Sequence, residues 1–223
     1  MEKKLNHSNF LDLSQSISNE IFKNCKYPWE VLPLIKDFII NLGKSLPKEF
    51  FGEIKENVWV SKNNVKIYPS AHIDGPAIID DNAEIRHCAF IRGSVIIGKN
   101  CVVGNSTELK NVILFNNVQV PHFNYVGDSI LGYKSHLGAG AITSNVKSDR
   151  SLITVKCNGS KIETDLKKFG AIIGDYAEIG CNAVLNPGTI IGRNSSVYPT
   201  TMVRGIIEEN TILKNTGEKV SKK

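Results

Sequence analysis

The 223-residue sequence lacks the features that mark a membrane or secreted protein. No stretch approaches the roughly 18 apolar residues that a spanning helix needs, and the first residues, MEKKLNHSNFLDLSQS, have no signal-peptide core. The five cysteines are odd in number and contain no CxxC pair, which argues against a disulfide framework and a zinc ribbon. We therefore expect a cytoplasmic protein in a reducing compartment, with no membrane partner.

Signatures of nucleotide and nucleic-acid binding are also missing. Neither a GxGxxG run nor a P-loop with its Lys-Ser/Thr occurs, so ATP-type phosphate binding is not indicated. The formal net charge of +5 is modest, and no basic stripe is interleaved with aromatic residues. This balance is poor evidence for a nucleic-acid partner and suits a small anionic molecule better.

What the sequence does contain is a sixfold rhythm of large apolar residues. A small residue, often alanine, stands two positions before most of them, so each hexad offers one large and one small inward side chain. A helical period drifts off a six-residue lattice, and an ordinary half-buried strand would repeat its large apolar residues every second position. A parallel β-helix keeps the lattice, with three hexads in each coil. We therefore predict an all-β solenoid. The large positions are Ile67, Ile73, Ile79, Ile85, Ile91, Ile97, Val103, Leu109 and Phe115, then Ile173, Ile179, Leu185, Ile191, Val197 and Val203.

The patterns divide the chain into three zones. Residues 1–56 carry apolar residues at helical spacing and predict a small helical cap. It would cover the open end of the solenoid, where unpaired strand groups are otherwise exposed. Residues 57–206 carry the repeats, and the charged tail 207–223 is expected to fray.

The rhythm is interrupted twice. It runs through Phe115 and is out of phase after Pro121, which predicts a loop that leaves the wall of the solenoid and carries His122. A second excursion, at about 146–169, contains the alternating segments ITVKC and KIET around Asn158-Gly159 and predicts an inserted β-hairpin. Loops on a rigid scaffold commonly carry functional sites.

His122 is the first candidate for catalysis, because an imidazole can take up a proton near neutral pH. Glu108 precedes it by rather less than three hexads, so it lies roughly one coil below and would orient the ring. The alternative is a surface histidine whose ring is satisfied by the backbone.

Arg92 and Lys110 are three hexads apart, so they should stack on one wall and clamp a phosphate between a planar fork and a point charge. They could equally be two solvated wall charges. The run Gly138-Ala139-Gly140-Ala141 either offers backbone N–H groups to an oxyanion or forms a tight corner.

These residues carry a family resemblance. Residues 107–145 resemble the acetyltransferase domain of the bifunctional enzymes that make UDP-N-acetylglucosamine. Residues 148–192 are similar to archaeal-type sugar-1-phosphate nucleotidylyltransferases with an amino-sugar acetyltransferase domain. The resemblance covers about 65–206 and rests on the spacing of a set of site residues: Arg92, Glu108, Lys110, His122, Tyr125 and Asn145.

The resemblance implies a left-handed β-helix that forms a homotrimer with active sites between subunits. It also implies acetyl-CoA as donor, an amino sugar 1-phosphate as acceptor and no metal. The oxyanion donor would be a backbone N–H near Ala139-Gly140 or the Asn145 amide. The implied roles are as follows: Arg92 and Lys110 hold the phosphate, Tyr125 and Asn145 contact the sugar, and Arg150 is a further basic residue that binds the substrate. His122 is the base oriented by Glu108, and the acetyl-CoA channel is lined by Ala139, Gly140, Cys181 and Pro199.

Departures from the family pattern keep the acceptor open. His136 and Val146 stand where the bifunctional enzymes have an asparagine and a tyrosine, and Cys181 replaces a serine. Both glucosamine 1-phosphate and galactosamine 1-phosphate therefore remain candidate acceptors. Because no nucleotide-binding signature stands near the start of this chain, uridylyl transfer would need a separate nucleotidyltransferase.

Two other classes compete with this interpretation. One is a γ-class carbonic anhydrase, in which three histidines, here including His87 and His122, would hold a metal. The other is a non-catalytic trimeric scaffold, or a subunit that binds sugar phosphate or CoA beside a separate nucleotidyltransferase.

Overall fold

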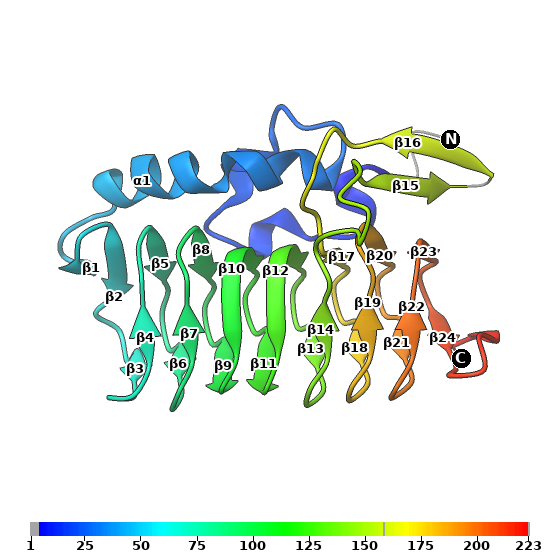
Figure 1. Cartoon of the computed structure of the whole chain (residues 1–223). Helices are drawn as coiled ribbons and strands as arrows, with labels where there is room; N and C mark the ends of the chain where they lie inside the picture. Colours follow the sequence, from blue (N-terminus) through cyan, green and yellow to red (C-terminus); the bar gives the residue numbers. More distant parts are fainter. Residues whose placement is uncertain (1–4, 158, 223) are drawn as a thin grey trace.

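The sixfold rhythm folds the chain into a rod of stacked coils (Figure 1). The computed structural model describes residues 5–157 and 159–222. Short parallel strands pair from coil to coil, and the large residues of the lattice stack inside with no exposed surface at positions such as Ile79, Ile85 and Ile91. The predicted left-handed β-helix of hexapeptide repeats is confirmed.

The coils present three faces. The covered face contains β2 (Val58–Ser61), β5 (Ala77–Ile79), β8 (Val95–Ile97), the second halves of β10 (Glu108–Leu114) and β12 (Tyr125–Leu131), β17 (Ala171–Ile173), β20 (Thr189–Ile191) and β23 (Ile206–Ile207). The second face contains β3 (Lys66–Ile67), β6 (Glu84–Ile85), β9 (Val102–Asn105), β11 (Gln119–His122), β13 (His136–Leu137), β18 (Glu178–Ile179), β21 (Ser196–Val197) and β24 (Thr211–Leu213). The third face contains β4 (His72–Ile73), β7 (Phe90–Ile91), the first halves of β10 and β12, β14 (Ile142–Thr143), β19 (Val184–Leu185) and β22 (Met202–Val203).

One corner of the solenoid changes the length of a coil. Ile91 pairs with Leu109, which keeps the regular interval of three hexads, but Ile97 pairs with Leu114, so this interval is one residue shorter. The residue is lost at Asn111, which turns the chain alone at φ 55° where Gly93 and Ser94 turn it together in the preceding coil. The predicted slip after Pro121, with a loop leaving the wall, is therefore wrong. The phase changes earlier, and residues 119–143 stay in the wall.

The sequence predicted that the N-terminal segment would cap the end of the rod, and this prediction is wrong. The segment runs along the covered face (Figure 1). It consists of 3-10 turns η2 (His7–Asn9), η3 (Leu13–Gln15), η4 (Asn19–Phe22) and η5 (Pro28–Leu34), followed by α1 (Ile35–Ser45). The reason is that covered-face strands are apolar on both sides. The outward residues Ile78, Ile96, Ile113 and Ile130 are fully buried, with α1 against β5, β8 and β10 and with η5 against β12.

Local sequence explains how this segment fits. Pro28 starts η5 at a position where proline is tolerated, whereas Pro33 lies inside the segment and lacks the N–H that a regular helix needs, so α1 begins only after it. In α1, the buried residues Ile35, Ile39 and Gly43 recur every fourth position and form one inward stripe. A Cβ on Gly43 would overlap the ring of Trp59, so the close approach requires glycine.

Strands, rather than a helix or a frayed tail, finish the two ends of the rod. β1 (Phe51–Lys55), inside the zone expected to be helical, pairs antiparallel with β2 at the first coil. At the other end, β24 continues the second face and β25 (Lys219–Ser221) folds back on it, so the expectation of a fraying tail is wrong over these residues.

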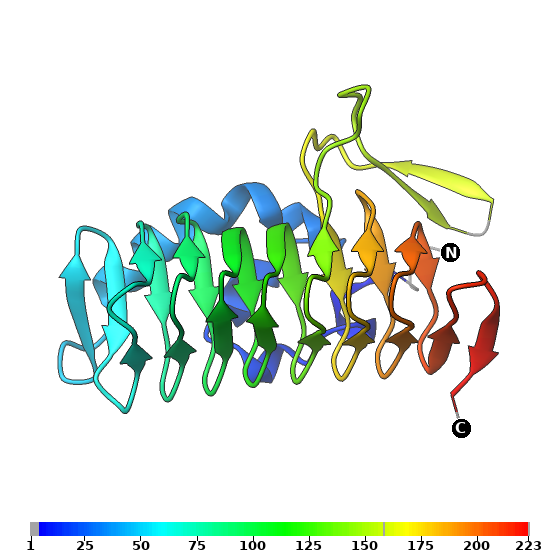
Figure 2. The ribbon, with the colours of Figure 1, turned by 60° about the horizontal axis from the view of Figure 1, so that its bottom comes forward.

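The inserted hairpin is confirmed. β15 (Thr154–Cys157) pairs antiparallel with β16 (Ser160–Glu163), and Figure 2 shows the pair projecting from the wall. The sequence predicted a turn at Asn158-Gly159, of which Asn158 lies outside the described residues. Ile142 pairs directly with Val184 in the next coil, so the whole insertion lies within a single coil. Within the described parts of the chain, no helix is long and apolar enough to cross a membrane.

Trp29 joins the N-terminal segment to the base of this insertion. The indole is 1% exposed, stacks on Tyr27 at 4.6 Å between ring centroids and lies 5.9 Å from the ring of Phe169.

Trp29→Ala is expected to lower the free energy of unfolding by about 3–5 kcal/mol, because it leaves a large cavity between two segments. Urea denaturation measures the loss, and a loss below about 1 kcal/mol would contradict this packing role.

Candidate active site

The predicted site residues gather at the two corners that border the third face. The cationic corner, between the third and covered faces, carries Arg92, Lys110 and Asn145. The histidine corner, between the second and third faces, carries His122. Tyr125 projects from the third face between the two corners.

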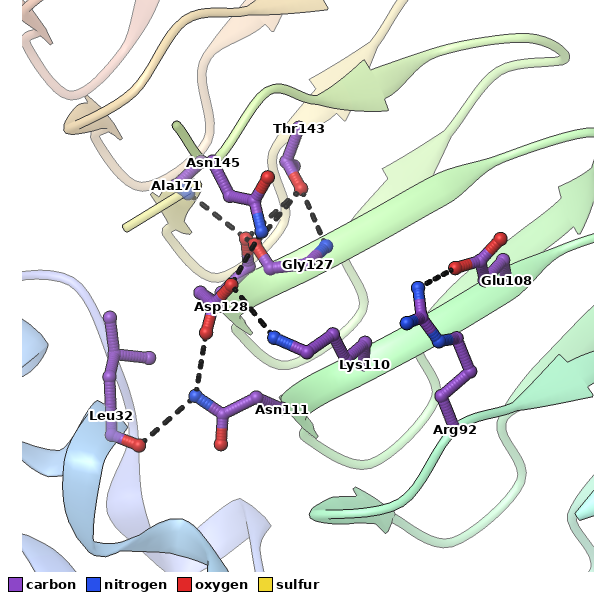
Figure 3. Close-up of polar contacts among 11 residues, drawn as sticks. Leu32, Arg92, Glu108, Lys110, Asn111, Gly127, Asp128, Thr143, Asn145 and Ala171 are labelled. Carbon is purple, nitrogen blue, oxygen red and sulfur yellow. Dashed lines mark hydrogen bonds and ion pairs between the residues drawn. The ribbon is translucent and has the colours of Figure 1, made fainter. Parts of the chain in front are cut away.

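Arg92 and Lys110 stack as expected. Arg92 donates its backbone N–H to the Leu109 carbonyl, and Lys110 follows Leu109 in the next coil. Each cation already has a carboxylate: Arg92 Nη1 lies 2.6 Å from Glu108 Oε1, and Lys110 Nζ lies 3.7 Å from Asp128 Oδ2 (Figure 3). Neither pair uses all of its N–H donors, so both cations can still bind an anion.

Glu108 does not occupy the place that its spacing from His122 suggested. Its strand partner one coil on is Tyr125, whereas His122 pairs with Asn105. The described residues show no hydrogen bond between Glu108 and His122, and the carboxylate binds Arg92 instead. The physical reason is that the coil shortens by only one residue, so His122 stands above Asn105, at the corner that precedes Glu108 in the coil below.

Asp128 is the central residue that the sequence did not reveal. It is 4% exposed and accepts hydrogen bonds from Asn145 Nδ2 at 2.5 Å and from Asn111 Nδ2 at 3.0 Å (Figure 3). Asn111 also donates to the Leu32 carbonyl at 3.1 Å, which ties the N-terminal segment to this corner. One signal for this contact was available: Asp128 follows Asn111 by one shortened coil. Both residues therefore stand at the same corner, where each has a positive φ.

A buried polar layer supports the corner from inside. Thr143 Oγ1 accepts the backbone N–H of Gly127 at 2.9 Å and the Ser129 hydroxyl at 3.1 Å. Ser129 Oγ in turn accepts the N–H of Ala171 at 3.0 Å, where the chain returns from the insertion. Both hydroxyl residues stand at inward positions of a mostly apolar lattice, which is the sequence signal for this layer.

Tyr125 is held in the same network. Burial raises the pKa of its hydroxyl, and the charges of Asp128 and Glu108 raise it further. A hydrogen bond from Asn145 and the charge of Arg92 act on this pKa in the opposite direction. The hydroxyl therefore stays protonated at neutral pH and acts as a hydrogen-bonding group rather than a base.

The histidine corner holds its backbone through Asn124, which is 2% exposed. Its Oδ1 accepts the N–H of His122 at 3.1 Å, and its Nδ2 donates to the carbonyls of Gly138 and Ala141. The His122 side chain is exposed above this fixed turn. It is thus placed rigidly at its backbone and is open to a ligand on the third face.

The residues expected to line the acetyl-CoA channel stack along the histidine corner. Ala139 follows His122 by one coil, and Cys181 and Pro199 follow Ala139 at the same position. The N–H of Gly140 is donated to the His122 carbonyl at 3.0 Å. Within the described part of the chain, the neighbouring N–H of Ala139 has no acceptor, so it is the better donor for an oxyanion.

Two predicted residues lie away from this group. His136 is on the second face, where its Nδ1 lies 2.9 Å from Glu178 Oε2. Arg150 is exposed in a turn of the insertion, and its backbone N–H donates to the carbonyl of Lys147. A single copy of the chain therefore does not bring these side chains to the third face beside Tyr125.

The metal alternative has no counterpart among residues 5–157 and 159–222. In these ranges no group of three His, Cys, Asp or Glu side chains gathers as metal ligands do. His87 lies two coils before His122 on the same corner, with its Nδ1 3.0 Å from the Ser70 hydroxyl. The geometry therefore does not support the three-histidine site of a γ-class carbonic anhydrase.

Comparison with known proteins shows what the chain is similar to. Residues 170–205 match the family model for the bacterial transferase hexapeptide (six repeats), and residues 73–166 match the C-terminal domain of GMPPB. The hexapeptide repeat of the first model agrees with the stacked parallel coils of the fold.

Over most of its length, the chain is a homologue of part of the bifunctional GlmU proteins. It is 34% identical over 201 residues to "Bifunctional protein GlmU" of Methanococcus vannielii. The aligned residues cover 88% of this chain and 47% of that relative. It is 28% identical over 167 residues to the bifunctional sugar-1-phosphate nucleotidylyltransferase/acetyltransferase of Sulfurisphaera tokodaii, covering 66% of this chain and 41% of that relative. The chain thus spans about half the length of the curated relatives it matches.

Proposed function

We propose that the protein is an acetyl-CoA-dependent N-acetyltransferase that acts on an amino sugar 1-phosphate. The observation that carries the proposal is the pair of corners around the third face. One holds two stacked cations that suit a phosphate, and the other holds an exposed histidine beside a stack of small residues. The similarity to GlmU proteins and to a nucleotidylyltransferase/acetyltransferase supports this choice of chemistry.

The acceptor would bind with its phosphate on Arg92 and Lys110. Arg92 supplies a planar fork of N–H donors and Lys110 a compact charge, and both keep donors free of their carboxylate partners. Glu108 then has the role of holding Arg92 in place, rather than the role of orienting His122. The sugar ring would lie across Tyr125 toward the histidine corner.

The chemical step is a direct transfer. The nitrogen of the sugar amine attacks the thioester carbonyl, forming the C–N bond, while His122 takes the proton of the amine. The C–S bond then breaks, and the thiolate of CoA leaves and takes up a proton. The N–H of Ala139 would stabilise the oxyanion, and the general base is expected to contribute about 10²–10⁴-fold to the rate.

Three copies of the chain would complete the site. The outward side chains of the third face include an apolar stretch, Ile142, Val184 and Met202, of which Met202 is 62% exposed, and Phe90, 38% exposed, lies beyond Glu108 in the same row. A surface of this kind is typical of a contact with another copy of the chain. In such a homotrimer, Arg150 and His136 of one copy could reach the third face of another.

Release of free CoA from acetyl-CoA tests the function directly, with glucosamine 1-phosphate and galactosamine 1-phosphate as parallel acceptors. Turnover with either would establish the acyltransferase and identify the preferred sugar. Silence with both, in a protein that sedimentation shows to be a trimer, would overturn the proposal in favour of the non-catalytic binding subunit.

His122→Ala should lower kcat by at least about tenfold, because it removes the base without touching the turn that Asn124 holds. The matched control is His87→Ala, two coils away on the same corner, which should keep the wild-type rate. Sedimentation confirms that both variants keep the assembly. A wild-type rate in His122→Ala would rule out its role as base.

Thiol labelling tests the placement of the donor. Cys181 and Cys88 are both exposed on the histidine corner, whereas Cys101 is fully buried and its pKa is raised to about 12 by that burial. In the native protein we expect Cys88 and Cys181 to react and Cys101 to stay unlabelled. Saturating CoA should slow labelling of Cys181 and leave Cys88 unchanged, as mass spectrometry of the labelled peptides will show. Equal protection of both would argue against this path for the donor.

A further inference from the structure

We propose that Asp128 is a positioning residue that fixes the side-chain amide of Asn145 so that its oxygen, and not its NH₂ group, faces the acceptor. The inference rests on the proposed function for its substrate, but its geometry comes from contacts among described residues. It assigns to Asn145 the recognition of a hydrogen-bond donor on the sugar, an amine or a hydroxyl, and removes it as a candidate for stabilising an oxyanion.

The first step of the argument is the chemistry of a buried carboxylate. An ionised aspartate only accepts hydrogen bonds, so every amide that touches it must present its NH₂ side. Asp128 is 4% exposed and touches two amides, with Oδ1 accepting from Asn111 and Oδ2 from Asn145. Lys110 Nζ stands near the same oxygen as Asn145. Both asparagines are therefore held in one orientation.

The second step concerns the two hydrogens of the Asn145 amide nitrogen. One is donated to Asp128 Oδ2 at 2.5 Å. A hydrogen bond also joins Asn145 to the Tyr125 hydroxyl and lowers the pKa of Tyr125, as a donor to the phenol oxygen does. No described residue donates to Asn145 Oδ1, and Figure 3 shows this oxygen on the side away from Asp128. The free group is therefore an acceptor.

The N-terminal segment keeps Asp128 in place. Asn111 Nδ2 lies 3.0 Å from Asp128 Oδ1 and 3.1 Å from the Leu32 carbonyl, so one amide joins the buried η5 turn to the carboxylate. The backbone of Asp128 is fixed too, because its carbonyl accepts the N–H of Gly170 at 2.8 Å. The orientation of Asn145 is thus set by segments far apart in the sequence.

Asp128→Asn tests the proposal, because Asn111 and Asn145 donate to different oxygens of Asp128 and the variant replaces one of these oxygens by an NH₂ group, which only donates. We expect the KM for the amino sugar 1-phosphate to rise about 10- to 100-fold, as the loss of a charge-assisted hydrogen bond implies. The KM for acetyl-CoA should stay within about twofold, since the donor binds at the other corner. Asn145→Asp, which sets two carboxylates against each other, should have a similar effect.

The reciprocal double variant gives the sharper result. In Asp128→Asn combined with Asn145→Asp, the amide at 128 donates to the carboxylate at 145, whose second oxygen still offers an acceptor to the sugar. We expect the acceptor KM of this double variant to be at least about tenfold lower than that of either single variant. Failure of either single variant to raise the acceptor KM, or no recovery in the pair, would overturn the proposal.

Asp175→Asn is the matched control for a merely structural effect. Asp175 is 2% exposed and also ties the N-terminal segment to the solenoid, through the N–H groups of Asp12 and Tyr133, but it lies outside the site. It should lower the melting temperature without changing the KM for the acceptor. An equal rise of the acceptor KM in Asp175→Asn would show that Asp128 acts only through stability.

A readout without turnover separates this inference from the proposed function. In wild-type protein, the side-chain amide protons of Asn145 should exchange slowly with solvent, and Asp128→Asn should speed their exchange at least about tenfold by NMR. If no amino sugar phosphate is acetylated but this change occurs, the function fails and the positioning role stands. If turnover is seen and the exchange does not change, the positioning role fails alone.

Discussion

The stacking of inward side chains from coil to coil is the constraint on which the rest of the structure depends. Because strands pair in parallel at each level, a residue added or lost at one corner shifts everything that follows it. The coil shortens by one residue at Asn111, and every later pairing up to the insertion keeps the shorter interval. That shift sets Tyr125 above Glu108 and His122 above Asn105, whereas the pairing of Glu108 with Arg92 belongs to the regular interval before it.

The cationic corner is also where the segments outside the regular coils attach. The insertion leaves after Asn145, and on its return Phe169 donates its N–H to the Asn145 carbonyl, while Gly170 donates to Asp128. Phe169 packs near Trp29 of the N-terminal segment, and Asn111 bonds the Leu32 carbonyl. The corner is therefore held from three sides, as rigid support of a binding site requires.

Charge balance at this corner favours selectivity over strong attraction. The two cations are paired with Glu108 and Asp128, so the four side chains sum to no net charge. A phosphate would share Arg92 and Lys110 with these carboxylates rather than bind to bare cations, and only a ligand that also satisfies Tyr125 and Asn145 would gain the full set of hydrogen bonds. Buried Asp128 contributes through the orientation of its neighbours more than through its charge.

The sequence by itself determined the solenoid, because a sixfold lattice of large and small residues is compatible with little else. It also determined the inserted hairpin, from its alternating segments, and the stacking of Arg92 on Lys110, which follows from the regular interval of three hexads. It could not place the N-terminal segment, since both the end and the covered face of the rod offer apolar surface. Only the tertiary structure decided that His122 and Glu108 are apart and that Asp128 joins Asn111, Asn145 and Lys110. These contacts depend on one residue lost at a corner and on the side-chain directions there, which no spacing in the chain specifies.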